Sequence, residues 1–214
     1  MKTVKQFYES VDFDRMITEM PRLMMECIER ESEIVRAARG SFGDVLEVGC
    51  GYGRILEMLS GTGRIVGIDF CEAMVEQART NCAGLGTEIY LMNADEIGFS
   101  DESFDTVLCL NHTMSNMPGI EGDVLYAMFR VCRWGGRVMV SVYSERARDV
   151  QMANYLRLGL RIERENGNSI YLKEGLYSRR FSRRDIRGLF KSAGFPCRIT
   201  SLNSISYLVV ASKE

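Results

Sequence analysis

Three glycines at alternate positions follow a short apolar run in the stretch VLEVGCGYGR, residues 45–54. Gly49, Gly51 and Gly53 carry no side chains, so a ligand or another backbone can approach this turn closely. Asp69 lies 20 residues after Gly49, at the end of the next apolar run, RIVGID. A carboxylate at that place can accept hydrogen bonds from both hydroxyls of a ribose. The spacing therefore favours a nucleoside as the ligand.

Glu47 argues against a dinucleotide, because a carboxylate two residues before the first glycine repels a pyrophosphate. The dinucleotide fingerprint also needs a glycine at position 54, where this chain has Arg54. Further along, NADEIGFSDESFD supplies Asp95 and Glu96, and Asp95 can accept a hydrogen bond from an exocyclic amino group such as that of adenine. Glu47, Asp69 and Asp95 together suit a nucleoside that carries positive charge and no phosphate. S-adenosylmethionine meets that description.

The elements that must position these residues alternate between strand and helix. Apolar runs predict strands at 44–48, 64–69, 87–92, 104–110 and 135–143, with helices between them at 53–59, 71–83 and 121–133. A helix over 12–38 precedes this series, and a helix over 182–193 runs from a Ser182 cap to Gly194. Two final strands, 197–202 and 206–212, have no helix between them and should form an antiparallel hairpin at one edge.

This alternation predicts an α/β fold, with a mostly parallel sheet covered by helices on both faces. The glycine turn then lies where a strand feeds a helix, at the carboxyl end of the sheet, which is where doubly wound folds bind ligands.

Four stretches in succession resemble the motifs of class I S-adenosylmethionine-dependent methyltransferases of the small-molecule type. They are VLEVGCGYGR, GID, NADEIGFSDESFDTVLC and CRWGGRVMVSVY, and the resemblance covers residues 42–143 with a compatible end at 182–212. One departure is CRWGG, where the family usually has proline before the glycines and this chain has Trp134. The resemblance implies a Rossmann-like, doubly wound, seven-stranded sheet whose last strand is antiparallel.

The resemblance also implies roles for individual residues. The backbone at Gly49, Gly51 and Gly53 approaches the methionine part of the cofactor, and Asp69 binds the ribose. Asp95 and the neighbouring Glu96 lie on the adenine side, Phe70 and Met74 line the adenine pocket, and Glu47 lies near the ammonium group. Asn111 is a pocket neighbour by its position after the fourth strand, with an amide that can donate and accept. Purely structural alternatives stay open: Glu47 as a solvated residue at a strand end, Asp69 as a helix cap and Asp95 as a turn residue.

His112 is the only histidine, and it follows the fourth strand, beside the expected position of the transferred methyl group. It either orients or deprotonates the nucleophile, as a catalytic residue, or hydrogen-bonds locally to hold its loop. Tyr8 is either a lid residue over the cofactor or a surface tyrosine. Arginines cluster in RRFSRRDIR, residues 179–187, which indicates either a solvated face or recognition of an anionic substrate group.

Length and net charge restrict the domain organisation and the possible partners. The 214 residues suffice for a single methyltransferase domain, 1–214, with an N-terminal helical lid over 1–40. Residues 145–181 do not fit the alternation, and we expect them to form a substrate cap with a helix and a hairpin turn at Asn166-Gly167. Tyr177 and Arg179 in this insertion are candidate substrate residues. A net charge of −2 gives no general attraction to nucleic acid or to an anionic membrane.

Seven scattered cysteines and one histidine show no paired spacing for a metal, so we expect no metal site and reduced thiols in a cytoplasmic protein. The expected partner is a small-molecule acceptor, with no membrane and no nucleic acid, and the chain is expected to be a monomer or a homodimer. The expected activity is methyl transfer from S-adenosylmethionine to a nitrogen, oxygen or carbon nucleophile. The alternatives are methyl transfer to RNA or protein, a non-catalytic S-adenosylmethionine-binding regulator, and a dehydrogenase, against which Glu47 and Arg54 argue.

Overall fold

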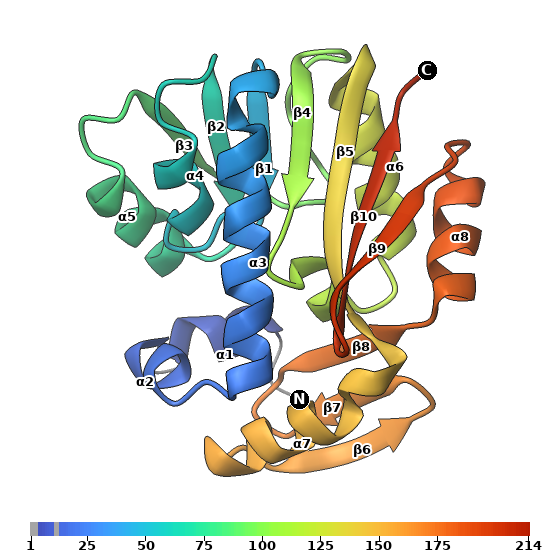
Figure 1. Ribbon diagram of the computed structural model, residues 1–214. Coiled ribbons are helices and arrows are strands. Elements are labelled where there is room, and N and C mark those ends of the chain that lie inside the picture. The colour runs from blue at the N-terminus through green and yellow to red at the C-terminus, as the bar shows by residue number, and fades with distance from the viewer. Residues whose placement is uncertain (1–3, 11–12) are drawn as a thin grey trace.

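A computed structural model describes residues 4–10 and 13–214, and it shows a central sheet with helices on both faces (Figure 1). The predicted strands appear as β1 (Val45–Val48), β2 (Ile65–Asp69), β3 (Thr87–Leu91), β4 (Phe104–Cys109), β5 (Cys132–Ser144), β9 (Arg198–Asn203) and β10 (Ser206–Ser212). The predicted helices after them appear as α4 (Arg54–Met58), α5 (Glu72–Asn81), α6 (Glu121–Val131) and α8 (Arg183–Ser192). Helix α8 begins with the predicted Ser182 cap, completed by Asp185 in a capping box.

The sheet has the order that a doubly wound fold requires. β3, β2, β1, β4 and β5 lie side by side and run parallel, so that Val45 pairs with Ile65 on one side and with Thr106 on the other. β10 then runs antiparallel to β5, and β9 runs antiparallel to β10 at the edge. These seven strands confirm the predicted sheet and its hairpin. The carboxyl ends of the parallel strands β1 to β4 point toward the bottom of Figure 1, where α1 lies.

Side chains of β1 alternate between two apolar layers. Leu46 and Val48 pack on the face covered by α6 and α8, whereas Val45 packs on the face covered by α3 (Arg22–Ala38), α4 and α5. Glu47 has the same parity as Val45 and therefore points toward α3 and α4. The strand pattern alone thus decides which helices surround this carboxyl group.

The N-terminal segment is broken where a single helix over 12–38 was predicted. The structure has α1 (Val4–Ser10), α2 (Phe13–Thr18) and α3, while residue 12 lies outside the described residues. Pro21 causes the break, because it has no N–H to donate and takes an extended ψ of 143° as the N-cap of α3. The single-helix prediction is therefore wrong in this part, and helix α1 was not predicted.

The insertion 145–181 contains more strands than expected. A 3₁₀ turn (Glu145–Ala147) and α7 (Arg148–Arg157) precede β6 (Ile162–Asn166), β7 (Ser169–Leu172) and β8 (Tyr177–Phe181). β8 joins the end of β5, so the whole sheet has ten strands. The hairpin exists, but Asn166 pairs with Ser169, so its turn is Gly167-Asn168 rather than Asn166-Gly167. Gly167, at φ 55°, takes the left-handed conformation that this turn needs.

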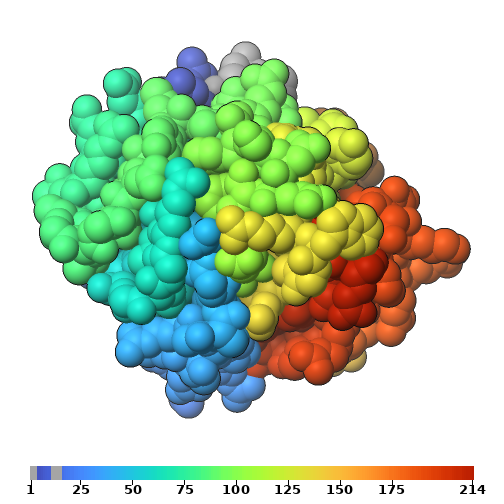
Figure 2. Space-filling view, turned by 90° about the horizontal axis from the view of Figure 1, so that it is seen from above, coloured from blue at the N-terminus to red at the C-terminus, as the bar shows by residue number. Residues whose placement is uncertain are grey.

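Helix α1 packs on the insertion. Phe7 is 2% exposed and lies in one apolar cluster with Tyr155, Ile170 and Leu172. Figure 2 shows the opposite end of the molecule from above, where green and cyan segments from the middle of the chain lie beside blue N-terminal segments, with red C-terminal segments along one side. Within residues 4–10 and 13–214, no helix has the length and apolar character to cross a membrane.

Candidate cofactor and acceptor site

A pocket of about 250 Å³ lies at the carboxyl ends of β1, β2, β3 and β4. Its walls come from α1, the turn after β1, and segments within 69–74, 92–95 and 110–120. Of the residues predicted to bind the cofactor, it brings together Glu47, Gly49, Gly51, Asp69, Phe70, Met74, Asp95 and Asn111. Four consecutive strand ends supply these residues, as the parallel topology predicts.

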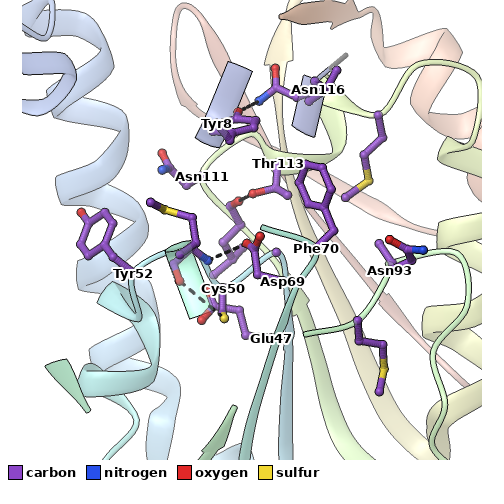
Figure 3. Close-up of a pocket in the computed structure, with 18 of the residues that line it drawn as sticks. Tyr8, Glu47, Cys50, Tyr52, Asp69, Phe70, Asn93, Asn111, Thr113 and Asn116 are labelled. Carbon is purple, nitrogen blue, oxygen red and sulfur yellow. Dashed lines mark hydrogen bonds between the residues drawn. The ribbon is translucent and has the colours of Figure 1, made fainter. Parts of the chain in front are cut away.

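Glu47 is the deepest polar group of the pocket. It is 4% exposed, and its Oε2 atom has no hydrogen-bond partner (Figure 3). Burial raises the pKa of this carboxyl well above its usual range, while the charge of Arg54 lowers it and the charges of Glu31 and Asp69 raise it further. A buried oxygen without a donor is costly to a folded protein, so this atom suits a ligand that brings an N–H group or a positive charge.

Asp69 organises the glycine turn. Its Oδ2 atom accepts a hydrogen bond from the backbone N–H of Gly51 at 2.9 Å, and its Oδ1 atom accepts one from the N–H of Cys71 at 2.9 Å. Burial raises the pKa of Asp69, and the bonds from Cys71 and Gly51 oppose that rise. Asp69 therefore bonds to the residue before α5, as the helix-cap alternative predicts, and the same carboxyl group also lies on the pocket wall.

The three glycines differ in what surrounds them. A Cβ atom at Gly49 would lie 2.3 Å from Cγ2 of Thr113, and one at Gly53 would lie 2.8 Å from Sγ of Cys82. Gly51, at φ 53°, has nothing within 4 Å of that position. Gly53 is not part of the pocket wall, and its missing side chain allows the turn to pack against α5, so its approach to the ligand stays a prediction.

The loop after β3 places Asp95 and Glu96 differently. Asp95 is exposed and lies on the pocket wall, next to Asn93. Glu96 is also exposed but does not reach the wall. Consecutive residues in a turn point in different directions, and this separates the pair. The prediction that Glu96 contacts the cofactor stays a prediction.

Tyr8 and Asn116 close the far end of the pocket from Glu47 (Figure 3). Asn116 Nδ2 donates a hydrogen bond to the Tyr8 hydroxyl at 3.0 Å, and Phe70 packs edge-on against the Tyr8 ring at 6.3 Å. Burial raises the pKa of Tyr8, so its hydroxyl stays protonated at neutral pH. Of the two readings of Tyr8, the geometry favours the one that places it over the pocket.

His112 does not line this pocket, and its contacts favour the alternative in which it holds its loop over the catalytic one. Its Nε2 atom lies 2.8 Å from Ser206 Oγ, and its ring stacks on Tyr143 at 3.9 Å between centroids. Burial lowers the pKa of His112 to about 3, so the ring is neutral at physiological pH. The left-handed backbone of Asn111 and His112, at φ 52° and 59°, turns one side chain to the pocket and the other to β10.

Tyr177 and Arg179 lie outside the main pocket, in a second hollow between β7, β8 and the start of α6. Arg179 forms an ion pair with Glu121 at 3.0 Å, and Tyr177 shares a hydrogen bond with Ser169 at 3.1 Å. Pro118 borders both hollows. Both residues thus lie across the 117–120 loop from the main pocket, and their contact with substrate stays a prediction.

Sequence reasoning missed the buried polar groups behind the pocket. Glu31 of α3 is 2% exposed and binds Arg54 at 2.8 Å, and Arg54 lines the pocket. The position of Arg54 directly after the glycine turn could have indicated that it lies at the pocket. Nothing in the local sequence distinguishes Glu31 from the other acidic residues of its helix. No group of three or more histidine, cysteine or acidic side chains that could hold a metal occurs among the described residues.

Residues 45–136 match the model of a methyltransferase domain family. The match covers the stretch in which the sequence resembles class I S-adenosylmethionine-dependent methyltransferases. The matched region starts at β1 and ends within β5, so it contains the glycine turn, Asp69 and the loop after β4.

Several relatives that the chain matches are methyltransferases by their names. Phosphatidylethanolamine N-methyltransferase of Cereibacter sphaeroides is 41% identical over 107 residues, which is 48% of this chain and 51% of the relative. A ubiquinone/menaquinone biosynthesis C-methyltransferase of Salmonella arizonae is 26% identical over 159 residues, 69% of this chain and 60% of the relative. The chain spans about half the length of the curated relatives that it matches.

Solved structures share the fold of the domain. Magnesium protoporphyrin IX methyltransferase from Synechocystis, solved with bound S-adenosylmethionine, has a TM-score of 0.67 at 16% identity and covers 99% of this chain and 95% of its own. 1,6-Didemethyltoxoflavin-N1-methyltransferase from Burkholderia thailandensis has a TM-score of 0.62 at 20% identity, and the match covers 84% of this chain and 75% of that protein. At these identities the likeness establishes the fold.

Proposed function

We propose that this protein transfers a methyl group from S-adenosylmethionine to a small-molecule acceptor. The observation that carries the proposal is the buried, unpartnered oxygen of Glu47 at the end of β1, in a pocket that also holds Asp69 and Asp95. A pocket with three carboxyl groups suits a cationic nucleoside and repels a pyrophosphate. Relatives that methylate a phospholipid amine or a quinone precursor, by their names, support a small acceptor.

Each wall of the pocket fits one part of this cofactor. We assign Glu47 to its ammonium group, Asp69 to its ribose hydroxyls and Asp95, at the rim, to its adenine amino group. Phe70 and Met74 supply apolar surface for the adenine ring. The open space beside Gly51 and the amide of Asn111 suit the methionine part.

The acceptor is assigned to the end of the pocket near Tyr8 and Asn116. When bound, the cofactor supplies an electrophilic methyl group on a sulfonium, which is a good leaving group. The protein's own contribution is then to align the acceptor and exclude water, which can be worth several kcal/mol. The described residues of the wall include no histidine or lysine, so the acceptor has to present a nucleophile that carries a lone pair without help from such a base.

The N-terminal residues and the insertion are assigned to acceptor choice. Helix α1 carries Tyr8 over the pocket and packs through Phe7 on the insertion. We therefore treat residues 1–40 as a lid and residues 145–181 as a cap on one domain. Tyr177 and Arg179 would influence acceptors that extend past Pro118 into the second hollow.

Titration calorimetry tests the cofactor assignment directly. We expect the protein to bind S-adenosylmethionine and S-adenosylhomocysteine and to show no heat with NAD. Binding of NAD without binding of S-adenosylmethionine would overturn the proposal. A panel of amine, quinol and heterocycle acceptors, with RNA and protein substrates beside them, then separates a small-molecule enzyme from the alternatives, and binding without any turnover indicates a regulator.

A further inference from the structure

Glu31 lies behind the pocket and bonds to three different elements. Its carboxylate accepts hydrogen bonds from Arg54 Nη2 at 2.8 Å, from Ser141 Oγ at 2.6 Å and from the backbone N–H of Asn111 at 3.0 Å. These partners belong to α4, to β5 and to the loop after β4. A buried carboxylate with this many donors is well satisfied, and removal of its charge leaves each donor with a weaker partner.

Arg54 is directed away from the pocket's own carboxyl group. Its Nη1 atom donates to Ser32 Oγ at 2.8 Å and its Nη2 atom to Glu31 at 2.8 Å, so both terminal nitrogens are engaged with α3. Glu47 makes no ion pair within the described part of the chain, although the positive charge of Arg54 is close enough to lower its pKa. Glu31 and Ser32 therefore hold the guanidinium on the side of α3.

The same carboxylate fixes the backbone at the end of β4. Asn111 and His112 are left-handed without being glycine, and such residues persist only where their surroundings hold them. Glu31 accepts the N–H of Asn111, and Ser141 Oγ, itself bonded to Glu31, accepts the N–H of His112 at 3.1 Å. Asn111 lines the pocket, so one carboxylate sets both an electrostatic and a geometric feature of its wall.

We propose that Glu31 is a positioning residue of the cofactor site, which keeps Arg54 off Glu47 so that the Glu47 carboxyl group faces a cationic ligand. This proposal rests on the proposed function, because it takes S-adenosylmethionine as that ligand. The competing interpretation is that Glu31 only ties α3 to the sheet. The two differ in what they predict for ligands of different charge.

Glu31→Gln keeps the size of the side chain and removes its charge. Arg54 is then free to turn toward Glu47 and adds positive charge where the ligand brings its own. S-adenosylmethionine carries the ammonium group that we assign to Glu47, whereas 5′-methylthioadenosine has the same adenosine part and no ammonium group. We expect at least tenfold weaker binding of S-adenosylmethionine by calorimetry and no more than about threefold weaker binding of 5′-methylthioadenosine.

Glu33→Gln is the matched control, because Glu33 lies on the same helix, two residues away, and is exposed. It should bind both ligands as the wild type does. The double variant Glu31→Gln/Arg54→Met removes the misplaced guanidinium, and we expect it to bind S-adenosylmethionine more tightly than Glu31→Gln alone. Such a rescue is not expected if Glu31 only ties α3 to the sheet.

Three results would overturn the proposal: unchanged affinities in folded Glu31→Gln, equal losses for both ligands, or no rescue by Arg54→Met. If Glu31→Gln does not fold, Ser32→Ala provides the test. It removes the acceptor of Arg54 Nη1 and changes the packing little. Ser32→Ala should weaken S-adenosylmethionine binding about threefold, and unchanged binding contradicts the proposal. Failure of the proposed function has a different signature, since wild-type protein would then not bind S-adenosylmethionine.

Discussion

Carboxyl groups in the pocket differ in role because their partners differ. Asp69 is held by two backbone N–H groups, whereas Glu47 is buried with one oxygen unpartnered. Both have a raised pKa from burial, but Asp69 is already committed to the shape of the glycine turn. A substitution at either residue therefore tests a different property of the site.

Asp69→Asn should weaken the binding of S-adenosylmethionine by more than tenfold. Asparagine has one acceptor oxygen, so its amide nitrogen has to face the N–H of either Gly51 or Cys71. The loss of charge-assisted bonds worth about 1.5–3 kcal/mol each exceeds the roughly 1.4 kcal/mol of a tenfold change. Calorimetry measures the effect, with exposed Asp123→Asn as the control. An unchanged dissociation constant in a folded variant would rule out the assignment of Asp69.

His112→Asn should cost stability and leave turnover nearly unchanged. Asparagine tolerates the left-handed backbone at this position, so the substitution removes only the ring, with its bond to Ser206 and its stacking on Tyr143. We expect a loss of about 1–3 kcal/mol in urea unfolding and kcat/KM within about threefold of wild type. A loss of kcat of a hundredfold or more would restore the catalytic role.

The same variant also changes the pH dependence of stability. The pKa of His112 is lowered in the folded protein to about 3, so the unfolded chain binds a proton first as the pH falls below 6.5. This residue therefore costs wild-type stability between pH 6.5 and about 3, by up to about 1.4 kcal/mol per pH unit. Urea unfolding at pH 7 and at pH 5 measures this difference. The free energy of unfolding should fall more between the two pH values for wild type than for His112→Asn.

Helix α1 depends on the insertion for its position. Seven residues are too few for a stable isolated helix, so its order comes from packing of Phe7 against Tyr155, Ile170 and Leu172. Tyr8, the next residue, then reaches Asn116 across the pocket. Helix α1 and the insertion are thus packed together although they are far apart in sequence.

Phe7→Ala should release α1 and speed the loss of cofactor. A buried phenylalanine truncated to alanine costs about 3–5 kcal/mol, more than a single short helix can offset. We expect proteolysis within residues 4–10 and dissociation of S-adenosylmethionine at least fivefold faster in stopped-flow measurements. Glu9→Ala, on the exposed side of the same helix, should behave as wild type. Undiminished protection of α1 would contradict this mechanism.

Over the whole molecule, the pocket gathers residues from position 4 to position 120 at one end of the sheet. A ligand in the pocket therefore links α1, the glycine turn and the loop after β4, while β9 and α8 lie outside this set. Ligand binding should stabilise these two groups of segments unequally.

Hydrogen exchange with and without S-adenosylmethionine measures this difference. Exchange should slow in residues 4–10, 49–54 and 110–117, because bound ligand suppresses local opening there. Residues 183–203, in α8 and β9, should change little. Adenosine alone is the control, and we expect it to protect residues 69–74 more than 49–54. Uniform slowing throughout the chain would indicate global stabilisation instead.

The sequence by itself determined the α/β class, the parallel strands with their final hairpin, and the grouping of Glu47, Gly51, Asp69 and Asp95. These follow from local rules: apolar periodicity, caps such as Ser182, and the fact that parallel strands bring their carboxyl ends to one edge. The seven predicted strands match because each is a short apolar run with clear breaks.

Only the tertiary structure decided which way individual side chains point. His112 follows the right strand yet faces Ser206, and Tyr177 and Arg179 lie across a loop from the main pocket. The ion pair of Glu31 and Arg54 joins two helices that no spacing rule relates. Such choices depend on backbone angles at a few residues and on which buried groups satisfy one another. Those are properties of the packed chain, and no local segment of the sequence specifies them.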